Sequence, residues 1–132
     1  MIKQLNIFII LLLGVSFTSY AQETDQIYSI VGTWKAEEDE NSRWIFQNNG
    51  VLITDYLGVS DVLDKYDYNM SSDPPACGKG PVLVKSSRFN YLKLIDHEDN
   101  EVSCYYIMGL TDEYLTLKHT VNGYLAIFKK AN

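Results

Sequence analysis

Apolar and polar residues alternate over short stretches from Val31 to near the end of the chain, and clusters of turn-forming residues separate the stretches. Aromatic and β-branched residues dominate each stretch, and none sustains the apolar spacing of a helix. The pattern therefore predicts an all-β protein with eight strands, at residues 31–37, 42–48, 51–56, 66–70, 89–95, 101–108, 114–118 and 124–129.

Most links between these strands are short, and Asn49-Gly50 and Asn122-Gly123 are strong hairpin signals. Short links favour antiparallel strands that pair in sequence order. Eight such strands can close into an up-and-down meander barrel, whose interior admits side chains or one small ligand. The alternative is an open sandwich of two sheets. The barrel is preferred because three successive hairpins form the C-terminal half and because closure removes unpaired edges.

The two cysteines, Cys77 and Cys104, allow only one intramolecular bridge. Cys77 lies in a segment rich in proline, glycine and serine, residues 71–88, which interrupts the strand pattern; Cys104 lies in a predicted strand. A disulfide would attach the long segment to the barrel wall, and exported proteins usually pair such cysteines. The alternative is two reduced thiols. No histidine or third cysteine lies at metal-ligand spacing from either, so no metal site is predicted.

The first residues have the features of a secretory signal peptide. Lys3 precedes an apolar run at 7–13, and small residues at Ser19 and Ala21 predict cleavage before Gln22. A membrane anchor is the alternative, but the apolar run is shorter than the roughly 20 residues that a span needs. We therefore expect export, one domain at residues 22–132, and no membrane span after signal removal.

The formal net charge of the whole chain is −6, and loss of Lys3 with the signal makes the remainder more negative. Nucleic acids and anionic membranes require a basic face, so neither is expected as a partner. The densest acidic runs, at residues 37–40 and 96–101, lie between predicted strands and are interpreted as solvated turns.

A family resemblance rests on four short motifs. The chain resembles secreted bacterial lipocalin-like proteins in Gly32-x-Trp34, Trp44-x-Phe46, Asn49-Gly50 and Phe128-Lys129. The resemblance implies an eight-stranded meander barrel with a ligand-sized interior, in the periplasm or medium of a Gram-negative bacterium. It also implies that Trp34 packs across the closed end beneath a basic residue, Lys129 or Lys130. The chain is shorter than a typical lipocalin and shows no C-terminal helix, which argues against a roomy calyx.

Aromatic residues are the candidate binding groups, because the chain has 10 Tyr, 5 Phe and 2 Trp. Tyrosine supplies an apolar wall with a hydroxyl that can orient a ligand. The expected function is a non-enzymatic exported binding protein for a small apolar ligand, without a cofactor. The predicted ligand-binding residues are Trp44, Phe46, Tyr66, Tyr68, Tyr91, Tyr106, Met108 and Phe128, with Tyr124 as a further candidate.

Two alternatives use other features. Aromatic residues could simply fill the barrel, in which case the long loop and surplus surface tyrosine favour a protein-interaction or inhibitor module of the cell envelope. Catalysis is the least supported function. The only histidines, His97 and His119, lie at apparent turns or strand ends with no motif that supplies a catalytic or metal partner.

Overall fold

The computed structural model describes residues 28–57, 63–80, 83, 85 and 90–131. The predicted signal peptide lies outside these residues. Within them, all regular structure is β-strand, and no helix has the length and apolar character needed to cross a membrane.

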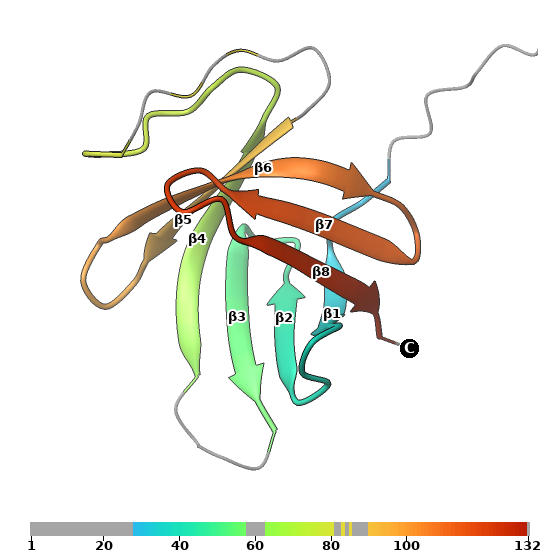
Figure 1. Cartoon of the computed structure of the whole chain (residues 1–132). Helices are drawn as coiled ribbons and strands as arrows, with labels where there is room; N and C mark the ends of the chain where they lie inside the picture. The colour runs from blue at the N-terminus through green and yellow to red at the C-terminus, as the bar shows by residue number, and fades with distance from the viewer. Residues whose placement is uncertain (1–27, 58–62, 81–82, 84, 86–89, 132) are drawn as a thin grey trace, which may run out of the picture.

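Eight strands pair antiparallel in sequence order and close into a barrel, as Figure 1 shows. The predicted up-and-down topology is thus confirmed, and it fits a lipocalin-like fold. The strands are β1 (Gly32–Ala36), β2 (Ser42–Phe46), β3 (Val51–Tyr56), β4 (Asp64–Ser71), β5 (Asn90–Asp96), β6 (Val102–Leu110), β7 (Tyr114–His119) and β8 (Leu125–Lys130).

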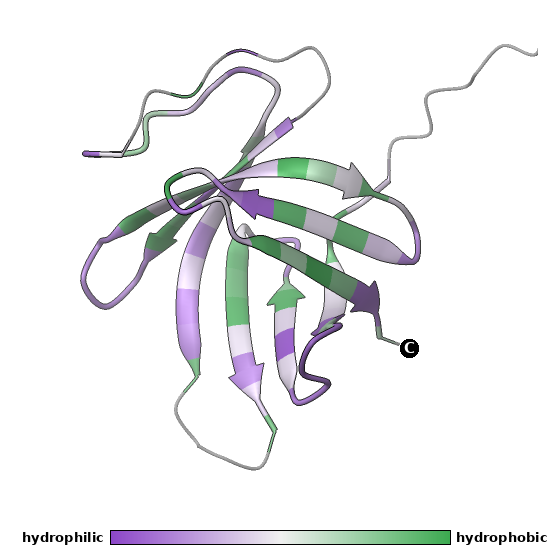
Figure 2. Cartoon of the chain, viewed as in Figure 1, coloured by the Kyte–Doolittle hydropathy of each residue, from purple (hydrophilic) through white to green (hydrophobic). Residues whose placement is uncertain are grey.

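Closure depends on the pairing of the first strand with the last. Trp34 lies opposite Lys130, and Ala36 lies opposite Phe128. This pairing excludes the open sandwich, because an open sheet would leave β1 and β8 as edges. Figure 2 shows apolar and polar residues alternating along β7. The apolar residues of this strand, Leu115 and Leu117, are the buried ones.

Seven of the eight strands differ from their predicted limits by one or two residues, and only β3 matches at both ends. β4 begins at Asp64, two residues before the predicted start, because Asp64 and Lys65 continue the pairing with β3. β6 extends to Leu110, past the predicted end, through a bulge between Ile107 and Gly109. A bulge inserts an unpaired residue and shifts the alternation, so simple period-two counting stops there.

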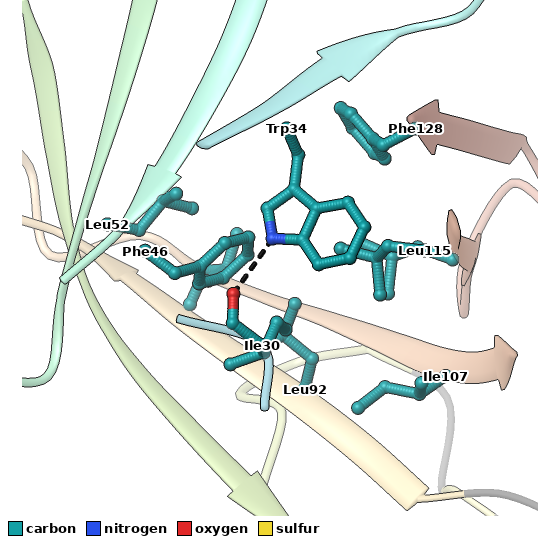
Figure 3. Close-up of a cluster of buried hydrophobic side chains, with 10 residues drawn as sticks. Ile30, Trp34, Phe46, Leu52, Leu92, Ile107, Leu115 and Phe128 are labelled. Carbon is teal, nitrogen blue, oxygen red and sulfur yellow. Dashed lines mark hydrogen bonds between the residues drawn. The ribbon is translucent and has the colours of Figure 1, made fainter. Parts of the chain in front are cut away.

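The barrel interior is packed with apolar side chains (Figure 3). Trp34, Leu52, Leu92, Leu115 and Leu117 are each 0% exposed. Burial of this kind is the main source of stability in a small domain. The remaining buried members of this core are Ile30, Phe46, Leu94, Ile107 and Phe128.

Trp34 closes one end of the barrel, here called the sealed end. Its indole Nε1 donates a hydrogen bond to the Ile30 carbonyl at 2.8 Å, which satisfies the one polar atom of a buried ring (Figure 3). Lys130 Nζ lies 4.5 Å from the indole centre and donates to the Val31 carbonyl at 2.8 Å. The basic partner of Trp34 is therefore Lys130, while Lys129 pairs with Lys35 at the next register position.

Gly32 is required by this arrangement for two reasons. Its φ of +139° lies in a region that residues with a Cβ rarely adopt. A Cβ at this position would also collide with the ammonium end of Lys130 and lie 2.7 Å from Lys130 Cε. Any larger residue must therefore strain the backbone and displace the lysine from Trp34.

We expect Gly32→Ala to lower the free energy of unfolding by about 1–3 kcal/mol, measured by urea denaturation. Gly109→Ala is the matched control, because Gly109 has no positive φ and no atom lies within 4 Å of its added Cβ. Equal stability losses in the two variants would contradict the role assigned to Gly32.

The predicted disulfide between Cys77 and Cys104 is present. It attaches the segment after β4 to the outer wall of the barrel. A second small apolar cluster lies beneath that segment and consists of Leu83, Tyr91 and Cys104, with Cys77, Val102 and Tyr106 packed against it. The protein thus has one core inside the barrel and a smaller one outside it.

The Cys77→Ala/Cys104→Ala variant should unfold with a free energy about 3–4 kcal/mol lower than the parent, because the bridge closes a loop of 27 residues in the unfolded chain. Urea denaturation monitored by circular dichroism measures the change. The barrel should still form, since its eight-strand pairing does not include the bridge. A loss below about 1 kcal/mol would contradict the loop-closure argument.

Candidate functional site: the mouth of the barrel

The end of the barrel opposite Trp34 is here called the mouth. It carries the β1–β2 loop (37–41), the β5–β6 loop (97–101) and the β7–β8 loop (120–124). Directly opposed residues share one face of a sheet. The register pairs Trp34 with Trp44, Trp44 with Thr54, and Thr54 with Asp64, so these residues point inward together.

An aromatic layer forms the floor of the mouth. The Trp44 ring lies 4.8 Å from the Phe128 ring and 6.0 Å from the Tyr105 ring, measured between centroids. Trp44 is on β2 and Tyr105 on β6, which are not neighbours in the barrel, so their contact crosses the interior. Tyr105 also meets the His119 ring edge-on at 5.1 Å. Since the core fills the interior below this layer, a ligand would have to be held above it.

A cavity of about 160 Å³ opens beside Trp44, between β1, β2 and β8. Apolar and aromatic side chains make most of its wall, and Glu38 is the one charged residue among them. The lining residues are Ala36, Glu38, Ser42, Trp44, Tyr124, Ala126, Ile127 and Phe128.

Two tyrosine hydroxyls hold the acidic β1–β2 loop at the rim. Tyr124 donates a hydrogen bond to Glu38 Oε2, and Tyr56 donates to Asp39 Oδ2, each at 2.7 Å. Both tyrosines remain exposed, and exposed Leu57 lies beside Tyr56 in the chain. The acidic run was predicted to be a solvated turn, and it forms the β1–β2 loop as expected.

The phenol groups of Tyr66 and Tyr105 hold their protons more tightly than a free tyrosine does. Burial raises the pKa of Tyr66 above 10.0, and the negative charges of Asp64, Asp96 and Asp99 raise it further. The pKa of Tyr105 is raised by burial and then by the neighbouring Tyr66. The part that the three carboxylates play in raising the Tyr66 pKa indicates a negative electrostatic potential at this residue.

Five of the eight predicted ligand-binding residues point into the barrel: Trp44, Phe46, Tyr66, Tyr68 and Phe128. Phe46 and Phe128 are only 1% and 3% exposed, so they belong to the packed core. Tyr68 packs edge-on against Phe46 and donates its hydroxyl hydrogen bond to the Gln47 carbonyl. Trp44, Tyr66 and Phe128 are the predicted residues that reach the mouth, and the further candidate Tyr124 lines its cavity.

The other three predicted residues lie elsewhere. Tyr91 and Tyr106 pack on the outer wall with the disulfide, their rings 5.7 Å apart. Met108 is 38% exposed at the β6 bulge. Tyr106 does not join the mouth because alternation places Tyr105 on the inner face of β6 instead. Tyr91 lies opposite Tyr106 and faces outward with it.

Sequence reasoning missed Tyr105 and Glu38 as mouth residues. A signal for Tyr105 existed. A disulfide to a long loop requires Cys104 to face outward from a closed barrel, which turns Tyr106 outward and Tyr105 inward. Glu38 carried no comparable signal, because its position depends on the loop fold and on Tyr124, 86 residues away.

The histidines have structural contacts. His97 Nε2 lies 2.8 Å from Asp67 Oδ1 in an exposed pair. His119 Nδ1 accepts hydrogen bonds from the Val121 and Asn122 amides in the β7–β8 turn. No group of three His, Cys, Asp or Glu side chains that could hold a metal ion occurs within the described part of the chain.

Comparison with known proteins adds no functional assignment. No protein family, curated protein or solved structure matches the chain. Function therefore has to be argued from the geometry of the mouth.

Tyr105→Phe should reduce the loss of stability that the parent suffers in alkali. A phenol whose pKa is raised in the folded protein binds its proton more tightly there than in the unfolded chain. Stability therefore falls as the pH rises through the unfolded value of 10.0 and above. Urea denaturation of both proteins between about pH 9 and pH 11 measures this. Parallel profiles would show that Tyr105 does not contribute.

Proposed function

We propose that this protein is an exported, non-enzymatic binding protein that holds a small ligand in the mouth of its barrel. The observation that carries the proposal is the cavity beside Trp44, where partly buried aromatic side chains meet a few polar groups. Such a combination is typical of small-molecule sites.

The size of the cavity restricts the ligand. Drug-sized sites occupy roughly 300–1,000 Å³. A cavity of about 150 Å³ in another protein accommodates benzene. At about 160 Å³, this cavity suits one ring or one short branched alkyl group. A long acyl chain or a haem would need the interior that the core already fills.

Export is supported by two features of different kinds. The disulfide is consistent with folding in an oxidising compartment. The first 21 residues have the composition of a cleavable signal. We propose that the mature protein is periplasmic or released from a Gram-negative bacterium, as the resemblance to bacterial lipocalin-like proteins implies.

An interaction module is the second candidate, and a separate groove favours it. A groove of about 500 Å³ lies on the outer wall between the disulfide loop at 77–80 and the β7–β8 turn. Val121, 64% exposed, lies on its border. This candidate requires a protein partner and would leave the mouth empty of ligand.

Titration with 3,3-dimethylbutan-1-ol, a small neutral alcohol with a branched alkyl end, tests the binding function. We expect saturable binding with a dissociation constant on the order of 1 mM, as suits so small a compound. In NMR spectra of labelled protein, the indole signals of the two tryptophans report where the alcohol binds. The Trp44 indole signal should shift, while that of Trp34, buried and bonded to Ile30 at the sealed end, should not.

Ala126→Leu should weaken this binding about tenfold or more, because it adds apolar volume to a residue that lines the cavity. Lys118→Leu is the control, because it introduces leucine at an exposed position outside the barrel. Lys118 follows the inward-facing Leu117 along β7 and therefore faces the other way. Equal binding of the alcohol to both variants would contradict its placement in the mouth.

A further inference from the structure

The lining of the Trp44 cavity points to a more specific ligand. Resting on the proposed function, we infer that the group which enters the mouth is an organic cation, a substituted ammonium with a small apolar surround. Three features of the described residues carry the inference: the charge on the cavity wall, the aromatic faces beside it, and the potential of the surrounding mouth.

The charge on the cavity wall is negative. Glu38 is the only ionisable acid or base among its lining residues apart from the Tyr124 phenol. The Tyr124 hydroxyl donates to one oxygen of Glu38 and thereby positions the carboxylate at the cavity. The pKa of Tyr124 is raised by this hydrogen bond and by the carboxylate charge. A cation entering the cavity would meet this carboxylate, whereas a fatty acid or phosphate would be repelled by it.

Aromatic rings make the adjacent surface. Trp44 and Phe128 lie 4.8 Å apart and both line the cavity, with Tyr124 at its rim. The face of an aromatic ring carries partial negative charge, and indole attracts cations most strongly. Methylated ammonium groups combine positive charge with an apolar surface, so they suit such a wall better than a bare ammonium or a metal ion.

The electrostatic potential of the wider mouth is also negative. Asp64 lies opposite Thr54 and Asp96 lies opposite Tyr66, on the inner face. Burial raises the pKa of Tyr66, and these two carboxylates raise it further. Arg43 is turned away from it, since it alternates with Trp44 along β2 and forms an ion pair with Asp55 at 2.7 Å. Lys65 alternates with Tyr66 along β4 in the same way. The nearest basic side chains of these strands therefore leave the negative potential of the mouth in place.

Choline and 3,3-dimethylbutan-1-ol form the test pair, because they share one shape and differ by a charged nitrogen in place of a neutral carbon. We expect choline to bind about three- to thirtyfold more tightly, with the shift again at the Trp44 indole. Glu38→Gln should lower choline affinity about two- to fivefold and should lower the affinity for the uncharged alcohol less than that.

Glu37→Gln is the matched control, since it makes the same charge change one residue earlier, where Glu37 borders an outer groove with Lys35 and Lys129. It should leave choline binding unchanged. Equal losses in the Glu37 and Glu38 variants would overturn the inference, because the preference would then reflect net charge alone.

The two proposals fail in different ways. If the alcohol binds at Trp44 and choline binds no more tightly, the inference is overturned and the proposed binding function stands. If neither compound perturbs the Trp44 indole, the proposed function fails and the inference fails with it.

Discussion

The seam between β1 and β8 is the constraint on which the rest of the structure depends. Lys130 crosses the seam, lies over the Trp34 ring and bonds the Val31 carbonyl, and only glycine at position 32 leaves room for it. The contact joins the two ends of the sheet at the place where the core is covered. Gly32 and Trp34 on the first strand and Lys130 on the last thus combine the closure of the barrel with the sealing of one end.

Sealing one end determines where function can lie. Trp34 and the leucines above it fill the interior from that end, and the Trp44–Tyr105 contact bridges the barrel above them. A filled barrel keeps only a shallow mouth and its outer wall for recognition. The same packing that stabilises a small domain therefore excludes the deep calyx of a larger barrel, and it directs attention to short, compact ligands.

Much of this fold could be predicted from local sequence. Period-two alternation located all eight strands, and Asn49-Gly50 and Asn122-Gly123 marked hairpins whose glycines have φ of 83° and 70°. The sequence indicated less well which side chains of β6 face the interior, because the adjacent Tyr105 and Tyr106 have the same side chain. The outward disulfide at Cys104 decides between them, which shows that a covalent constraint on one residue assigns the face of its neighbours.

The charge of the cavity could not be predicted in the same way. Glu38 lies within a run of four acidic residues, and nothing local distinguishes it from Glu37. The barrel makes the distinction: Tyr124 reaches Glu38 from the β7–β8 loop, and Trp44 lines the same cavity as Glu38. A solvated acidic turn becomes a candidate recognition element only because closure of the sheet brings an aromatic wall to one of its carboxylates. Under the proposed binding function, the chemistry of the ligand depends on the contact between the β7–β8 loop and the β1–β2 loop, which closure of the barrel brings together.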